Sequence, residues 1–188
     1  MGNPAPQRNA PSLQSVLVGL DRFAQHPAAY KWAVENNRVI DMLGDFARER
    51  KLLLFQSGNE SENWMDPAIN VVYKMNTLMH VGGDILRLLQ RIDLYNQLFP
   101  EVAMRFVGFQ LMSETNVYPV FAQQFISNAR FATEKEIRDY MQSMSFLSTG
   151  NDGEFTNGKL LLKDVRPKNV LYSATGAIFV IDADVERI

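Results

Sequence analysis

Three polar side chains near the C-terminal end of the sequence form the set best suited to catalysis. Asp164 is followed five residues later by Asn169, and Asp182 comes thirteen residues after that. Carboxylate and amide oxygens are ligands that magnesium prefers, and a carboxylate can also accept a hydrogen bond from an attacking hydroxyl. The set therefore suits the binding of a magnesium nucleotide and the alignment of a hydroxyl for phosphoryl transfer.

A hydrophobic hairpin separates the two candidate metal ligands. Residues 169–172 and 177–181 read as its strands, with the turn at Thr175-Gly176. Each acid alone would fit an ordinary turn with exposed carboxylates. The whole set, with Arg166 in the same run, favours chemistry over that structural interpretation.

The order and spacing of these residues resemble the protein-kinase-like superfamily. Kinases carry His-Arg-Asp, an asparagine five residues after that aspartate, and Asp-Phe-Gly beyond a hairpin. More specifically, the runs at 96–100, 105–109 and 166–171 look like those of the small serine/threonine/tyrosine kinase-like domains of polyvalent proteins from phages and conjugative elements. The likeness covers roughly residues 52–188.

The resemblance implies a role for each residue of the set. Asp164 would be the catalytic base, and Arg166 would replace the usual lysine that stabilises the transferring phosphoryl group. Asn169 and Asp182 would bind Mg²⁺ beside the phosphates of ATP. The expected cofactors are therefore ATP and Mg²⁺, and the expected activity is that of a kinase acting on a hydroxyl of a protein or a small molecule.

A lysine at the end of a predicted strand is the next candidate. Lys74 closes a Val-Val-Tyr-Lys run, and in kinases a Val-Ala-Ile-Lys strand carries the lysine that contacts the nucleotide phosphates. Its usual partner is a glutamate on the following helix, but none occurs between Lys74 and Pro100. Asp93 is the nearest acid in suitable register, and Gln90 is a polar substitute. A surface lysine and a solvated helix acid are the alternatives.

The resemblance also implies a phosphate-binding turn and a hinge. Gly58 lies in a Ser-Gly-Asn-Glu-Ser run whose amides could contact a phosphate, although a plain hairpin turn fits it equally well. Gln123, Gln124 and Phe125 occupy the hinge position, where backbone groups would bind adenine.

Strands gathered before and after a single mid-domain helix predict an α+β protein with an antiparallel sheet. Residues 1–12 read as a disordered tail and 13–50 as an N-terminal helical extension. Residues 51–126 would form a kinase-like N-lobe with one key helix. Residues 127–188 would form a minimal, truncated C-lobe with the catalytic loop and the metal-binding hairpin.

Apolar periodicity and capping residues predict the individual elements. Helices are expected over 13–25 after Ser12, over one or two segments from Pro27 to Arg50, over 84–98, and over 134–146 with a Thr133/Glu136 capping box. Strands are expected over 52–55, 68–75, 104–112 and 117–125, and a loop is expected over 148–158.

Composition narrows the class of protein. The net charge is −2 and the pI is near 5.7, which lowers the expectation of nucleic-acid binding. The sequence has no cysteine and no apolar run long enough to span a membrane. We expect a cytoplasmic protein of a bacterial or phage-infected cell, without a membrane partner. His26 and His80 are spaced unlike metal ligands and are expected to be structural or exposed.

The sequence also departs from the kinase pattern. Leu162 and Lys163 replace the His-Arg before the catalytic aspartate, and Ala183-Asp184 replaces Phe-Gly. Nothing follows Ile188, so a conventional peptide-binding lobe is not expected. The N-terminal helices, a partner chain or the remainder of a longer polyvalent protein could supply that support. A pseudokinase that binds a nucleotide or a partner is the alternative function, and a nucleic-acid-binding phage protein is a third.

Overall fold

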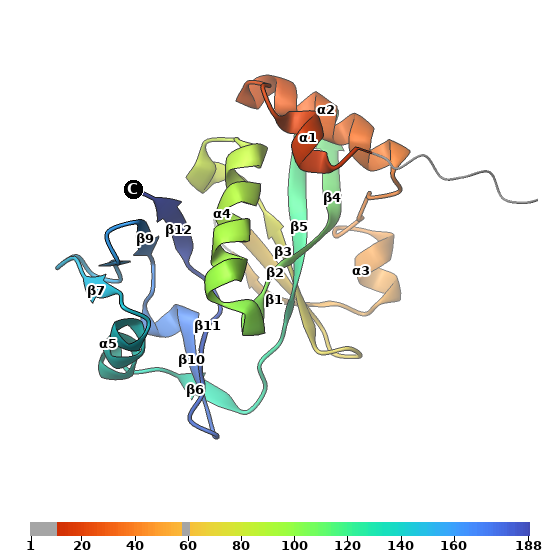
Figure 1. Ribbon diagram of the computed structural model, residues 1–188. Helices are drawn as coiled ribbons and strands as arrows, with labels where there is room; N and C mark the ends of the chain where they lie inside the picture. The colour runs from red at the N-terminus through yellow and green to blue at the C-terminus, as the bar shows by residue number, and fades with distance from the viewer. Residues whose placement is uncertain (1–10, 58–60) are drawn as a thin grey trace, which may run out of the picture. The chain divides into compact units, whose positions relative to one another are not determined.

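The computed structural model describes residues 11–57 and 61–188 and confirms an α+β protein with antiparallel sheets (Figure 1). The chain forms two compact units. The first holds the residues up to Trp64 together with 74–88 and 106–121. The second holds residues 65–73, 89–105 and 122–188.

Three helices lie in the N-terminal part of the first unit: α1 (Leu13–Leu17), α2 (Arg22–Glu35) and α3 (Asp45–Glu49). The single helix predicted over 13–25 is wrong in its extent. Ser12 caps α1 as expected, but Gly19 turns the chain with φ of 82° and Asp21 caps a new helix through the amides of Phe23 and Ala24. Pro27 was expected to restart the pattern, whereas it lies inside α2. The buried residues Gln25, Ala29 and Ala33 on both sides of it hold α2 in place.

The largest sheet has five strands in the order β1-β2-β3-β5-β4. Its strands are β1 (Leu53–Ser57), β2 (Ser61–Asp66), β3 (Val71–Asn76), β4 (Arg105–Ser113) and β5 (Asn116–Gln124). All except β2 were predicted. The sequence of β2, Ser-Glu-Asn-Trp-Met-Asp, has no apolar alternation, and its two buried side chains are the polar Asn63 and Asp66.

The segment after α2 pairs with the edge of this sheet at β4. Ile40 donates its amide to the carbonyl of Phe109 at 2.9 Å, and Phe109 donates to the carbonyl of Arg38 at 2.8 Å. A Cβ on Gly108 would lie 2.3 Å from that same Arg38 carbonyl oxygen. The glycine of the Arg-Phe-Val-Gly-Phe run therefore permits this close approach.

His26 is structural, as expected. Its Nε2 lies 3.1 Å from the carbonyl of Gly83, and its Nδ1 accepts from the amide of Val117 at 3.2 Å. The ring thus joins α2 to two other segments of the first unit.

Most of α4 (Ile85–Leu98) and all of α5 (Glu134–Ser143) belong to the second unit. The predicted end of α4 before Pro100 is confirmed, and so is the Thr133/Glu136 capping box of α5. The predicted end of α5 at Phe146 is wrong. It stops at Ser143, and Ser145 adopts a φ of 65°.

Two small antiparallel sheets complete the second unit, in the orders β11-β10-β6 and β12-β9-β8-β7. The 148–158 segment, predicted as loop, contains β8 and the end of β7. The strands are β6 (Ala129–Phe131), β7 (Leu147–Ser148), β8 (Phe155–Thr156), β9 (Leu160–Lys163), β10 (Val170–Ser173), β11 (Ile178–Val180) and β12 (Asp184–Arg187).

The core of the second unit lies under α4. Tyr95, Phe99 and Val102 are each at most 2% exposed. Asn96 donates to the carbonyl of Met104 at 2.9 Å and accepts from its amide at 2.7 Å. These two hydrogen bonds fix the turn after α4, and they explain why an asparagine begins the 96–100 run.

Candidate active site

The predicted terminal hairpin is confirmed as β10 paired with β11, with Val170 opposite Val180. Beyond that pair the amide of Ile181 donates to the carbonyl of Asn169 at 2.9 Å. The two candidate metal ligands, Asn169 and Asp182, therefore lie at the same open end of one hairpin.

Asp164 has an unusual backbone conformation. Its φ is 56°, in the left-handed region that residues other than glycine rarely adopt. The amide of Arg166 closes a tight turn onto the carbonyl of Asp164 at 3.0 Å, and a short 3-10 turn, Pro167–Asn169, follows. Strained conformations of this kind cluster at functional sites, where the surrounding structure holds them.

Three side chains hold the Asp164 carboxylate. The Asn169 amide donates from Nδ2 to Oδ2 at 2.7 Å and to the Asp164 carbonyl at 2.9 Å. Lys168 Nζ lies 3.2 Å from Oδ2, and Arg166 Nε lies 3.4 Å from Oδ1. The structure thus brings together Asp164, Arg166 and Asn169, and it adds Lys168, whose position four residues after Asp164 was not recognised in the sequence.

A neighbouring loop holds Arg166. Its Nε lies 3.2 Å from Oδ2 of Asp152, and a Cβ on Gly153 would lie 2.8 Å from Arg166 Cγ. The amide of Val165 also donates to the carbonyl of Gly153 at 3.0 Å. From the sequence, Asp152 and Gly153 are expected only to be part of a polar loop. Their Asp-Gly sequence signals a turn but does not say what the turn contacts.

The donor set fits a magnesium ion. Because Asn169 directs Nδ2 at Asp164, its Oδ1 faces the other way and can act as a ligand. The Asp182 side chain is exposed, and no described residue is hydrogen-bonded to its carboxylate or paired with it. Residues 11–57 and 61–188 contain no cluster of three histidine or acidic residues suited to a metal. Two oxygen ligands are nevertheless what a magnesium–nucleotide site takes from a protein, because phosphates and water complete the shell.

Burial raises the pKa of the Tyr95 hydroxyl strongly, and the negative charge of Asp182 raises it further. The Asp182 carboxylate therefore acts electrostatically on the buried hydroxyl of α4. From the sequence, Tyr95 is predicted only to belong to the apolar face of this helix.

Lys74 and Asp93 lie on different elements. Lys74 is half-buried on β3 in the first unit, and its relation to the catalytic loop remains a prediction. Asp93 is exposed on α4, two residues from both Arg91 and Tyr95, and therefore lies on the opposite face of the helix from them. The predicted pairing of Lys74 with Asp93 also stays a prediction.

The expected nucleotide contacts have different outcomes. Gly58 lies outside the described residues. Gln123 is buried, and its side chain bonds within the second unit. The Gln124 side chain and the Phe125 amide both donate to the carbonyl of Asn70, each at 2.9 Å. The Phe125 amide is thus already engaged, so the adenine-binding role proposed for the hinge requires other backbone groups of this segment.

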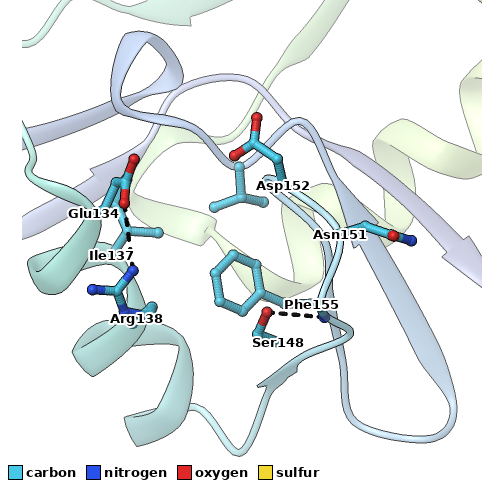
Figure 2. A pocket seen from close by; sticks show the side chains of 10 residues that line it. Glu134, Ile137, Arg138, Ser148, Asn151, Asp152 and Phe155 are labelled. Carbon is cyan, nitrogen blue, oxygen red and sulfur yellow. Dashed lines mark hydrogen bonds and ion pairs between the residues drawn. The ribbon is translucent and has the colours of Figure 1, made fainter.

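A hollow of about 230 Å³ opens next to the catalytic loop (Figure 2). Val165 contributes to its apolar lining together with Ile137 and Phe155. In Figure 2 Glu134 lies next to Ile137, and Asp152 lies above Phe155. Because Asp152 also pairs with Arg166, the hollow adjoins the candidate catalytic residues.

The chain matches a known protein family. A model described as a serine/threonine/tyrosine kinase found in polyvalent proteins matches residues 24–187. The match begins inside α2, so it includes α3 and most of α2 as well as the residues from 52 onward that resemble the family in sequence. No curated protein matches the chain. Within the described part of the chain, no helix is long and apolar enough to cross a membrane.

Proposed function

The chain belongs to the family of serine/threonine/tyrosine kinases found in polyvalent proteins, and on that premise we propose that it transfers the terminal phosphoryl group of ATP to a hydroxyl. The acceptor is a protein, including the chain itself, or a small molecule. Asp164, Arg166, Asn169 and Asp182 form the catalytic centre. Family membership supports a kinase activity in general, and the roles of these four residues are the proposed part.

Asp164 accepts the proton of the acceptor hydroxyl while the oxygen of that hydroxyl forms a bond to the γ-phosphorus. The bond from that phosphorus to the bridging oxygen of ATP breaks, and ADP leaves with the electron pair. Asn169 Oδ1 and the Asp182 carboxylate would hold Mg²⁺, and the ion would neutralise charge on the nucleotide phosphates.

Arg166 contributes charge near the transferring group. Both of its ion pairs use Nε, and no described residue accepts from its two Nη groups. The planar guanidinium can therefore present two N–H donors to the oxygens of the phosphoryl group.

The remaining nucleotide contacts are proposed from their position in the family pattern. Lys74 would contact the phosphates with Asp93 as its partner, and the hinge at 123–126 would bind adenine. This assignment divides the chain into a nucleotide-binding lobe over 51–126 and a catalytic lobe over 127–188.

The observation that carries the proposal is the hydrogen bond between Asn169 and Asp164. One amide joins the proposed base, through Nδ2, to the proposed metal site, through Oδ1. An amide and two cations hold the carboxylate of the left-handed Asp164, and they fix it beside the proposed metal ligand Asn169.

The same contacts also favour a second candidate. The Asp164 carboxylate is already engaged by three donors, and Ala183-Asp184 replaces Phe-Gly. A pseudokinase that binds Mg²⁺ and ATP without transferring phosphate would be compatible with both features.

Thermal unfolding with ATP, with and without Mg²⁺, tests the binding that both candidates share. A ligand at about 100 times its dissociation constant stabilises the folded protein by roughly 2.7 kcal/mol. We expect Mg²⁺ to increase the shift produced by ATP, and Asp182→Asn to remove that increase. Asp139→Asn, an exposed acid on α5, is the control and should behave as wild type. No magnesium-dependent shift in the wild type would contradict the proposal.

A further inference from the structure

Two side chains of α4 contact the chain on both sides of Asp182. Tyr95 donates its hydroxyl to the carbonyl of Val180 at 2.5 Å. Arg91 pairs with Asp184 at 3.5 Å and with Glu186. Residues four apart lie on the same face of a helix, so a single face of α4 reaches the positions two residues before and two residues after Asp182.

The Tyr95 contact has a defined direction. Gln123 donates from Nε2 to the Tyr95 oxygen at 3.0 Å and to the carbonyl of Val102 at 2.6 Å. Because the amide supplies the proton in the first bond, the tyrosine's own proton is directed to Val180. The ring is 1% exposed and lies 5.3 Å from that of Phe99, so the hydroxyl cannot turn to solvent.

The Arg91 contact belongs to a balanced group of charges. Its side chain is only 11% exposed. Lys163 also pairs with Glu186, at 3.3 Å, and lies opposite Asp184 in the ladder between β9 and β12. Two cations therefore face two carboxylates, which is the condition under which partly buried charges are tolerated.

We infer that Arg91 and Tyr95 are positioning residues that fix Asp182 for metal binding, because Tyr95 holds the backbone before it and Arg91 holds acidic side chains after it. The inference rests on the proposed function, since it assigns to Asp182 the role of a magnesium ligand. It gives Asp184 a different task from Asp182, because Asp184, together with Glu186, pairs with Arg91. Of the two aspartates in the Asp182-Ala183-Asp184 run, Asp182 is therefore the metal ligand and Asp184 helps to hold it in position.

The test uses Tyr95→Phe, which removes one hydroxyl and keeps the ring, and Arg91→Gln. Tyr140→Phe on α5 and Arg87→Gln, an exposed position one turn earlier on α4, are the matched controls. The measured quantity is the Mg²⁺ concentration that gives half-maximal binding of a fluorescent ATP analogue. Residues that support a metal ligand typically contribute 10- to 100-fold to metal affinity, so we expect an increase of about 10-fold in each test variant. Binding of the analogue without Mg²⁺ should be unchanged.

A second readout requires neither metal nor activity. Hydrogen–deuterium exchange of residues 181–184 in the free protein should be faster in both test variants than in the wild type and the controls. Arg91→Lys keeps one of the two ion pairs and should restore part of the magnesium affinity. A general loss of folding would instead accelerate exchange throughout the second unit, and that outcome would overturn the inference.

The two possible failures are distinguishable. If the wild type shows no magnesium-dependent binding, the proposed function is wrong and the inference fails with it. If the wild type shows that dependence and both test variants keep the same half-maximal Mg²⁺ concentration, only the inference is overturned.

Discussion

Arg166 lies across Gly153, and this contact shows how a loop outside the motif can position a catalytic side chain. Asp152 supplies a carboxylate to Nε, and Gly153 leaves room for the arginine stem. The motif residues themselves could be predicted because they are close in sequence and are separated by a recognisable hairpin. The role of Asp152 could not be predicted, because its partner Arg166 lies fourteen residues away in the sequence and the residues around Asp152 are typical of a loop.

Gly153→Ala tests this contact. Gly153 and Gly150 both have positive φ, 69° and 94°, so alanine is strained at either site by about 1–2 kcal/mol. Only at residue 153 would the new Cβ meet a neighbour, Arg166, whereas nothing lies within 4 Å of it at residue 150. We expect Gly153→Ala to lower phosphoryl transfer well below the level of Gly150→Ala at a similar melting temperature. Equal activities of the two variants would show that the glycine does not act through Arg166.

Arg91 illustrates a different limit of the sequence. The family pattern predicts an acid on α4 that pairs with Lys74, and Asp93 fits that position best. The cation two residues earlier pairs with Asp184 and Glu186, acids that lie near the end of the sequence. Which residues meet across such a distance depends on the fold and cannot be derived from helical spacing alone.

The elements were predictable where capping residues and apolar periodicity agreed. α4, α5, β4 and β5 follow such signals, and their existence is confirmed. β2, β9 and β12 were missed because they are short or polar and are specified by their neighbours in the sheet. The break between α1 and α2 was missed because apolar spacing continues across it, although Gly19 and Asp21 signal a stop and a new start.

The N-terminus of α5 should weaken in acid. Glu136 pairs with Arg130 at 2.6 Å and accepts from the Thr133 amide at 2.8 Å, and these bonds lower its pKa from 4.5 to about 2. A lowered pKa means that the stabilisation is complete above about pH 4.5 and is lost as the pH falls toward 2. Glu136→Gln should therefore reduce stability at pH 7 and flatten the loss of stability below pH 4.5. Circular dichroism melts across this range provide the measurement.

Glu134→Gln is the control, since Glu134 is exposed and makes only an ion pair within the helix with Arg138. A wild type and a Glu136→Gln variant with identical pH profiles would contradict the role given to the capping box.

The contact at Gly108 should be essential to pairing with the edge strand. Alanine at residue 108 would place its Cβ against a backbone carbonyl that cannot move as a side chain can. Overpacking of this kind typically costs about 1–3 kcal/mol. Urea unfolding should show a loss in that range, and the clash alone should cause it, because Gly108 lies outside the positive-φ region in which alanine is strained. A stability unchanged from wild type would show that the 38–40 segment can separate from β4.

At the level of the whole molecule, the family match extends further toward the N-terminus than the recognised resemblance. It begins at residue 24, so most of the predicted helical extension belongs to the family domain. The division into a tail, an extension and two lobes stays a prediction, as does a cytoplasmic location.

The net negative charge of the chain predicts that it does not bind nucleic acid. Binding to a phosphate backbone depends on clustered cations that displace counterions, and the chain carries a net charge of −2. We expect no retardation of duplex or single-stranded DNA in a gel at low salt. Retardation that disappears as salt is raised would instead support the nucleic-acid-binding alternative.

Transfer of label from ATP carrying a labelled terminal phosphate tests the central claim most directly. The wild type, with Mg²⁺, should label itself or a generic protein acceptor such as casein. Asp164→Asn keeps the size of the side chain and removes the base, so labelling should fall by about 10²- to 10⁴-fold while binding of magnesium and ATP persists. Equal labelling by the wild type and Asp164→Asn, or binding of magnesium and ATP by the wild type without any transfer, would contradict the account.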